Sequence, residues 1–202
     1  QNQLKQKLIF QPLPEGIERV GGLDVRYLDG RARAAAVVFD FHTMKVVEQA
    51  VVEVAAEFPY IPGLFSFREV PPLLAAMERL EKMPDVWLCD GQGTAHPRRF
   101  GLACHLGVML DMPAIGCAKS ILTGTHTLPL PERGQVSLLS DNGEVIGMAV
   151  RTRAHVSPVY VSAGHRADLE SAKRLVLACG RGMRLPEPLR LAHWLTTQSG
   201  HL

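Results

Sequence analysis

Three apolar, β-rich stretches follow one another near the start of this 202-residue chain, and they restrict its fold more than any other feature. They cover residues 20–28, 31–41 and 45–57. The dipeptide Asp29–Gly30 separates the first two stretches, and Asp-Gly between apolar runs is a strong β-hairpin signal. The pattern therefore predicts an antiparallel three-stranded meander.

Helices and strands alternate in the rest of the chain. A helix is expected to begin near Pro71, with Leu73, Leu74, Met77 and Leu80 as its apolar stripe. The further expected elements are strands at 85–90 and 114–120, a helix at 100–110, two or three strands around the DNGE turn within 134–163, and a helix at 166–180. This order predicts an α/β fold in which helices flank a mixed β-sheet, the order of ribonuclease-H-like domains.

The composition is that of an ordinary globular domain. Hydrophobic residues make up 47% of the chain and charged residues 21%, which argues against disorder, and the length predicts one domain over residues 1–202. The net charge of +2 imposes no global attraction to nucleic acid, although arginines cluster in HPRRF and GRGMR.

The cysteine pattern and the short length of the apolar runs indicate the cell compartment. The four cysteines form no C-x-x-C pair and read as buried, reduced thiols rather than a zinc site or disulfides. No apolar run approaches the roughly 18 residues of a membrane span, and no signal-peptide pattern opens the sequence. We therefore expect a cytoplasmic protein, monomeric and without a membrane partner.

Acidic residues in or beside apolar strands are the main sign of chemistry, because burying a carboxylate is costly unless a cation compensates. Asp24 lies within GGLDVRY, and Asp90 ends VWLCD, at the carboxyl end of a strand where α/β folds place their sites. With Glu69 they would suit a hard cation such as Mg²⁺. Alternatives stay open: Asp24 as a turn residue, Asp90 as a helix cap, and Glu69 as a capping box with Ser66.

Basic residues are less specific. Lys119 closes the apolar strand AIGCAK, where a merely solubilising lysine fits poorly, although a snorkelling lysine is the alternative. His96 and His165 lie at loop–helix junctions, where histidines often act as caps. The remaining histidines have no supporting neighbours and read as surface or packing residues: His42, His105, His126, His155, His193 and His201. The sequence has no P-loop, G-x-G-x-x-G, H-E-x-x-H or G-x-S-x-G motif.

Five segments taken in order, GLDVRY, PYIPGLFSFRE, DGQGTAHPRR, GCAKS and SAGHR, resemble the endonuclease V family of inosine-directed repair nucleases. The resemblance implies a ribonuclease-H-like fold and Mg²⁺-dependent cleavage of the second phosphodiester bond 3′ to inosine, with Mn²⁺ expected to substitute. The implied metal ligands are Asp24, Glu69 and Asp90. Lys119 would stabilise charge on the phosphate, and His165 would lie beside the attacking water or leaving group.

The resemblance also implies how the nucleic acid is bound. Tyr60, between Pro59 and Ile61, would be a wedge that opens the strands at the lesion, and the flanking prolines would stiffen it; a core or hinge role for Tyr60 is the alternative. The implied base pocket surrounds Gly63 and Gly91 with Leu122 alongside, and His96 and Arg98 would lie near the substrate backbone. Arg26 stands where the family commonly has a small polar residue.

The choice of substrate stays open at the level of sequence. The partner implied is inosine-containing nucleic acid, either double- or single-stranded DNA or RNA. A binder of distorted strands that does not cut them, and a related nuclease acting on inosine in RNA, are the alternatives. The intact carboxylate set disfavours the non-cleaving binder.

Overall fold

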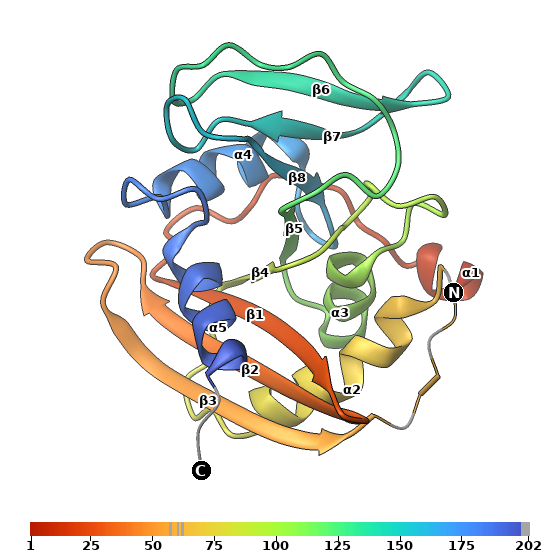
Figure 1. The fold of residues 1–202 in the computed structure, drawn as a ribbon, viewed down its shortest axis with the longest axis vertical. Helices are drawn as coiled ribbons and strands as arrows, with labels where there is room; N and C mark the ends of the chain where they lie inside the picture. The colour runs from red at the N-terminus through yellow and green to blue at the C-terminus, as the bar shows by residue number, and fades with distance from the viewer. Residues whose placement is uncertain (57, 60, 62, 199–202) are drawn as a thin grey trace.

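A single eight-stranded mixed sheet dominates the computed structural model, which describes residues 1–56, 58, 59, 61 and 63–198 (Figure 1). The strands are β1 (Arg19–Leu28), β2 (Arg31–Asp40), β3 (Val46–Ala55), β4 (Val86–Cys89), β5 (Ala114–Ala118), β6 (Val136–Asp141), β7 (Glu144–Val150) and β8 (Val159–Ala163). Their order across the sheet is β3-β2-β1-β4-β5-β8-β7-β6.

The meander β1–β2–β3 forms as predicted. Leu28 pairs with Arg31, so that Asp29 and Gly30 alone make the turn. Both turn residues have positive φ, 50° and 75°, as a type I′ turn requires. Asp and Gly tolerate this conformation better than most residues, which is why the dipeptide is such a strong signal.

The strands in the middle of the sheet are parallel, and the neighbouring strands reverse direction. β1 pairs in parallel with β4, and β4 with β5. β5 then pairs antiparallel with β8, as do β8 with β7 and β7 with β6. The carboxyl ends of β4 and β5 therefore meet at one edge, while β8 begins at that edge and ends at the opposite one.

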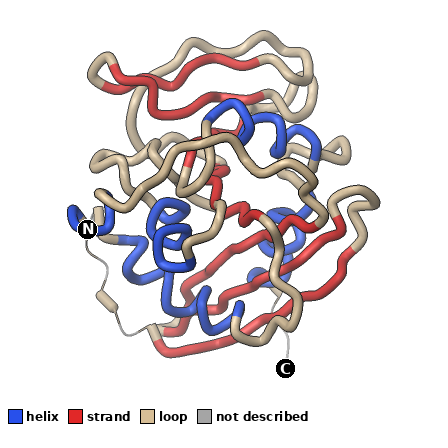
Figure 2. The backbone as a smooth tube through the Cα atoms, turned by 180° about the vertical axis from the view of Figure 1, so that it is seen from behind, coloured by secondary structure: helices blue, strands red, loops and turns tan. Residues whose placement is uncertain are grey.

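Two layers of helices cover the sheet (Figures 1 and 2). The helices are α1 (Asn2–Lys5), α2 (Phe65–Met77), α3 (Leu102–Leu110), α4 (Leu169–Ala178) and α5 (Glu187–Thr197). One buried apolar cluster joins α2 and α3 to the sheet, and a separate one joins α4 and α5 to it. The predicted mixed sheet flanked by helices is confirmed.

Helix α2 begins earlier than the sequence predicts. It starts at Phe65 rather than near Pro71, and it continues through Pro71 and Pro72. A proline inside a helix leaves the carbonyl four residues earlier without its usual donor. For Pro72 that carbonyl belongs to Arg68, and the Tyr27 hydroxyl of β1 donates to it at 2.7 Å. A long-range hydrogen bond thus compensates for one of the two prolines.

Two further results concern the helices. Ser66 lies inside α2 and its hydroxyl contacts His105 Nδ1 at 3.1 Å, so the capping box considered for Ser66 and Glu69 does not form.

Helix α5 was not predicted from the sequence. Among the described residues, no helix has both the length and the apolar character needed to span a bilayer.

Candidate active site

Asp24 and Asp90 meet because β1 continues past the end of its parallel neighbour β4. Leu23 pairs with Cys89, the last residue of β4, and the Asp90 N–H donates to the Leu23 carbonyl at 2.9 Å. Asp24 therefore lies mid-strand in β1 but at the level where β4 ends. The prediction that Asp90 follows a strand end is confirmed.

Helices bring further side chains to this edge from both faces of the sheet. Glu69 comes from α2 and is 8% exposed, whereas His193 comes from α5 on the opposite face. Helix α5 lies directly on β1: a Cβ on Gly22 would come within 2.3 Å of the Pro188 carbonyl oxygen. A glycine at position 22 thus allows the close approach that places His193 beside Asp24.

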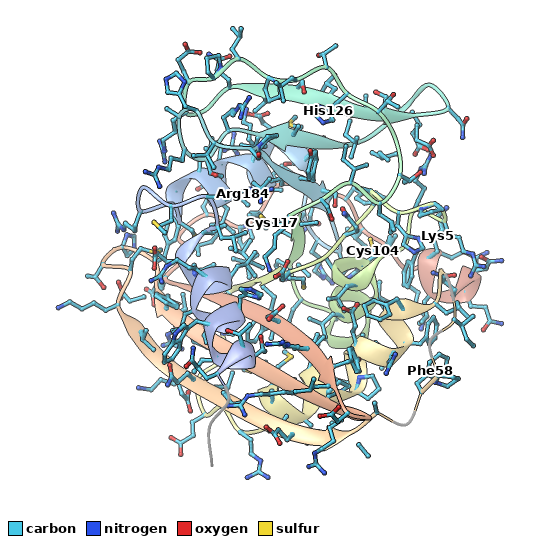
Figure 3. The ribbon with its side chains drawn as sticks, viewed as in Figure 1. Lys5, Phe58, Cys104, Cys117, His126 and Arg184 are labelled. Carbon is cyan, nitrogen blue, oxygen red and sulfur yellow. The ribbon has the colours of Figure 1, made fainter. Side chains whose placement is uncertain are left out.

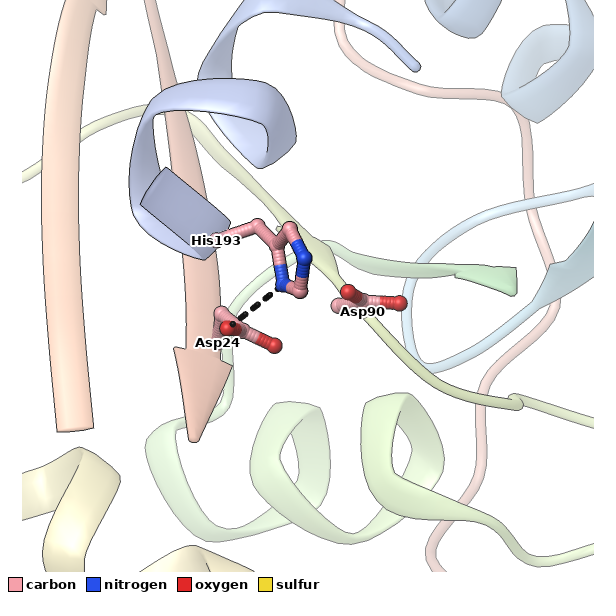
Figure 4. Close-up of side chains that lie close together, drawn as sticks. All are labelled: Asp24, Asp90 and His193. Atoms are coloured by element: carbon pink, nitrogen blue, oxygen red, sulfur yellow. Dashed lines mark hydrogen bonds and ion pairs between the residues drawn. The ribbon is translucent and has the colours of Figure 1, made fainter. Parts of the chain in front are cut away.

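Asp24, Asp90 and His193 form the centre of the site (Figure 4). One potential ligand atom from each lies within 4.8 Å of the others. His193 Nδ1 is 3.3 Å from Asp24 Oδ2, and Thr196, one helical turn further along α5, donates its hydroxyl to the same oxygen. Thr196 thus holds the Asp24 carboxylate in place, and His193 lies beside this carboxylate on the same face of α5.

Lys119 reaches the same centre from the end of β5. Its ammonium forms an ion pair with Asp90 Oδ2, and Nζ also lies 3.2 Å from His193 Nδ1. The alternative of a snorkelling lysine does not describe this side chain, because its charged end contacts a carboxylate that is largely buried.

Like charges crowd the site. Burial raises the pKa of Glu69 well above its usual range, and the nearby Asp24 and Asp90 carboxylates raise it further. Burial and then Asp24 also raise the pKa of Asp90, while Lys119 acts in the opposite direction. One lysine therefore compensates only part of the negative charge of three carboxylates.

The central three residues fit a divalent cation. An ammonium group can only donate, so its contact with His193 Nδ1 requires that this nitrogen be unprotonated and accept. A nitrogen in this state can bind a metal ion in place of the ammonium, and it lies 3.3 Å from the acceptor oxygen of Asp24. Carboxylate oxygens suit Mg²⁺ and Mn²⁺. Glu69, predicted as a third carboxylate ligand, lies beside this group rather than within it.

Two cavities flank the centre and share Asp90 and Lys119. The first, of about 540 Å³, runs between α2 and the segments that follow β4 and β5; Glu69 also lines it. The second, of about 510 Å³, contains Asp24, His193 and Arg26. The charged centre thus lies between two cavities, an arrangement that would let a chain molecule lie across it.

Four of the eight residues predicted to bind substrate line the first cavity: Gly63, Gly91, His96 and Leu122. His96 Nδ1 accepts the backbone N–H of Arg98, and burial, followed by the Arg98 and Arg99 charges, lowers the pKa of His96. A neutral His96 ring therefore carries its proton on Nε2. Arg98 is exposed, and its Nη1 donates to Gln1 Oε1 at 2.8 Å.

The loop before α2 is described only in part. Pro59 is exposed and Ile61 is 40% exposed, whereas Tyr60, predicted as the wedge, lies outside the described residues. Gly63, at the end of this loop, has a φ of +77°, which favours glycine.

His165 does not lie at this site, and the prediction that it acts beside the phosphate needs correction. Because β8 runs antiparallel to β5, its end reaches the start of β5, where Ala114 N donates to the His165 carbonyl at 3.0 Å. Lys119 follows the other end of β5. The His165 ring instead bonds the Asp111 carboxylate at 3.0 Å and accepts the Ile9 N–H at 3.3 Å, a structural role.

His193 was assigned to the surface or to packing, and that assignment was wrong. Its sequence neighbours are apolar or small, and nothing near it in the chain indicates a partner. A usable signal was nonetheless present: Pro188, Leu189, Ala192 and Leu195 predict a helix with one buried face. His193 and Thr196, three residues apart, would have formed a polar pair at its edge.

Comparison with known proteins places the chain in a family context. The family model described as endonuclease V matches residues 2–194. The endonuclease V of Methanothrix thermoacetophila is 53% identical over 186 residues, which cover 92% of this chain and 83% of the relative. The crystal structure of Streptomyces avermitilis endonuclease V superposes with a TM-score of 0.93 at 44% identity, covering 97% of this chain and 88% of that one.

A third similar protein was solved with nucleic acid. It is the endonuclease V of Ciona intestinalis in complex with a 24mer DNA containing an inosine followed by a ribo-adenosine. It is 30% identical with a TM-score of 0.82, and the match covers 97% of this chain and 92% of that one.

Proposed function

Because the chain belongs to the endonuclease V family, we propose that it is a metal-dependent endonuclease that cleaves inosine-containing nucleic acid at the second phosphodiester bond 3′ to the lesion, in DNA repair. The observation that carries this proposal is the grouping of Asp24, Asp90, His193 and Lys119 between two open cavities. The products would carry a 5′-phosphate and a 3′-hydroxyl.

Each group at the centre has a role in this proposal. Asp24, Asp90 and His193 would hold Mg²⁺, or Mn²⁺ in its place, with the Glu69 carboxylate beside them. A bound ion of this kind lowers the pKa of a water ligand and neutralises charge on a phosphate. Lys119 would place its ammonium against the scissile phosphate, where a fixed cation stabilises charge that develops in the transition state.

The first cavity would receive the flipped base. Inosine pairs weakly with thymine, so extruding it costs less than extruding a normal base. Gly63, Gly91, His96 and Leu122 line the cavity next to Asp90 and Lys119, and Arg98 would lie along the substrate backbone. Pro59, Tyr60 and Ile61 would form the wedge that fills the space the base leaves.

The proposal is tested with matched DNA and RNA oligonucleotides that contain inosine or adenosine at one position. Cleavage is followed with Mg²⁺, with Mn²⁺ and with a chelator, and the cut is mapped to one nucleotide. We expect metal-dependent cleavage of the inosine strands alone. The DNA of the Ciona complex carries a ribo-adenosine after the inosine, which motivates the RNA arm.

The experiment also decides between the alternatives. Binding of inosine strands without any cut would identify a non-cleaving binder, and a cut confined to RNA would identify an RNA-directed nuclease. Asp90→Asn is the matched control, since an amide lacks the charge a metal needs. It should abolish cleavage and retain substrate binding; a parallel loss of both would indicate a structural role for Asp90.

A further inference from the structure

The guanidinium of Arg184 is bonded to three main-chain carbonyls next to the candidate active site (Arg184 is labelled in Figure 3). Nη2 donates to the Lys119 carbonyl at 2.6 Å and to the Pro158 carbonyl at 2.9 Å, and Nε donates to the Ser157 carbonyl at 3.0 Å. These carbonyls lie just after β5 and just before β8, at the sheet edge where the site is built.

The backbone of Arg184 is also held by a hydrogen bond. The Thr152 hydroxyl donates to the Arg184 carbonyl at 2.5 Å. Among the described residues, no carboxylate lies within ion-pair distance of this guanidinium, so its bonds serve the main chain alone. A planar guanidinium presents its donors in a rigid fork, which makes the relative positions of the three carbonyls well defined.

The Arg184 contacts link Lys119 to the helix of His193 through the main chain, in addition to the direct contact between the two side chains. Arg184 lies three residues before the start of α5, the helix that carries His193. Its side chain bonds the carbonyl of Lys119, whose own ammonium is 3.2 Å from His193 Nδ1. The residue after β5 is therefore tied to the segment that leads into α5, and the Lys119 side chain meets His193, in the second half of α5, at the centre.

We propose that Arg184 is a positioning residue: it fixes the main chain of Lys119 relative to α5 and so sets where the Lys119 ammonium lies beside Asp90 and His193. The reaction in which this matters rests on the function proposed above. Arg184 acts through Lys119 and makes no contact with the reacting atoms. Misplacing a group in an active site by about 1 Å can cost about 100-fold in rate.

The test is a double-variant cycle on the inosine oligonucleotide, with Lys119→Ala, Arg184→Ala and the combination. We expect Arg184→Ala to lower kcat between about 10- and 100-fold and to leave KM within about threefold. The double variant should be no slower than Lys119→Ala alone, because Arg184 has nothing left to position. Arg133→Ala is the matched control: Arg133 also donates to a carbonyl, that of Leu177 at 2.6 Å, and its loss should leave kcat unchanged.

Arg184→Lys distinguishes the effect of the guanidinium geometry from that of the positive charge. It also provides the test if Arg184→Ala fails to fold. It retains the charge without the fork, and we expect it to recover little of the lost rate. Full recovery by lysine, multiplicative losses in the double variant, or an unchanged kcat in Arg184→Ala would each overturn the proposal.

A readout independent of cleavage keeps the test separate from that of the proposed function. The imidazole NMR signals of His193, assigned with a His193→Gln variant, should shift in Arg184→Ala and Arg184→Lys but not in Arg133→Ala. Unshifted signals would refute the positioning role even in a protein that cuts inosine. A wild-type protein that leaves inosine strands intact would instead refute the proposed function, with the positioning role still decided by the His193 signals.

Discussion

The Asp24 carboxylate accepts a hydrogen bond from Thr196, and the same carboxylate oxygen lies 3.3 Å from His193 Nδ1. Thr196 therefore fixes where this carboxylate points, and His193 in the same helical turn supplies a candidate ligand atom. His193 thus belongs to the candidate metal group and also contacts Lys119.

His193→Ala should lower the rate of inosine-strand cleavage by about 100-fold or more, because loss even of a group that only supports a metal ligand costs about 10- to 100-fold. Mn²⁺ affinity of the protein alone, measured by calorimetry, should fall in parallel. His193→Asp restores a ligand oxygen and should recover part of both. The exposed His155 provides the control, His155→Ala. Unchanged Mn²⁺ affinity in His193→Ala would remove His193 from the metal group.

Lys119→Ala should lower turnover about 100- to 1,000-fold, by analogy with the loss of one fixed oxyanion donor, about 2.7–4 kcal/mol. The melting temperature should also fall in the absence of metal, because the variant leaves the largely buried Asp90 carboxylate without its ion-pair partner. The control is Lys173→Ala, which removes an i,i+3 ion pair with Glu170 on α4. A loss of less than about threefold would show that the Asp90–Lys119 ion pair plays no part in the reaction.

At the scale of elements, the first half of α2 is held in place by contacts with β1. Prolines 71 and 72 weaken its own hydrogen bonding just after Glu69, and the Tyr27 hydroxyl replaces one missing donor. The guanidinium carbon of Arg68 also lies 4.0 Å from the centre of the Tyr27 ring. β1 therefore holds the turn of α2 that presents Glu69 to the site.

Tyr27→Phe leaves the Arg68 carbonyl without this donor and should destabilise the protein by about 1–3 kcal/mol. For a chain of this size each kcal/mol lowers the melting temperature by about 2–4 °C. Cleavage should also slow, since Glu69 follows Arg68. Tyr160→Phe is the matched control, because the described residues offer the Tyr160 hydroxyl no hydrogen-bond partner. Equal melting temperatures for the two variants would show that the prolines need no compensation.

The loop before α2 allows a second prediction at this scale. If Tyr60 is the wedge, Tyr60→Ala should melt like the wild type and lose more activity on duplex than on single-stranded inosine DNA, where less must be unstacked. Phe10→Ala, at an exposed aromatic residue outside this loop, is the matched control and should leave activity on both substrates unchanged. A large fall in melting temperature, or equal losses on both substrates, would instead indicate the core or hinge role.

At the scale of the molecule, the elements that could be predicted are those whose signals are local. The Asp29–Gly30 turn and the apolar runs around it define the meander, and Asp90 directly follows a short apolar strand. The start of α2 could not be predicted, because the donor that makes Pro72 tolerable comes from Tyr27, far away in sequence. His193 was missed for the same reason: its partners belong to other elements.

The direction of β8 explains why His165 was wrongly expected at the site. The resemblance implied that His165 lies beside the phosphate, but sequence does not determine whether the strand before it runs parallel or antiparallel to β5. The antiparallel pairing of β8 with β5 takes His165 to the far edge of the sheet. Local patterns and the family resemblance thus identified candidate residues, and the pairing of strands decided which of them meet.

The crowded carboxylates should also affect the stability of the whole molecule. Burial, Asp24 and Asp90 raise the pKa of Glu69 in the folded protein above its value in the unfolded chain. Above the unfolded pKa the folded state therefore binds more protons than the unfolded state, so stability falls as pH rises toward the folded pKa. Without a metal, the burial of the Glu69 carboxyl group beside Asp24 and Asp90 therefore weakens the fold at pH values above the unfolded pKa.

Glu69→Gln removes that charge, and in the presence of a chelator we expect it to melt at a higher temperature than the wild type at pH 7 while losing cleavage activity. The difference should shrink as pH is lowered, because protonation then neutralises Glu69 in the wild type as well. Glu170→Gln, at a largely exposed carboxylate on α4, should show no such gain. Added Mn²⁺ should raise the melting temperature of the wild type, since a ligand that binds only the folded state stabilises it. A Glu69→Gln variant that is less stable than the wild type at pH 7 in chelator would mean that the carboxylate is a net stabilising contact.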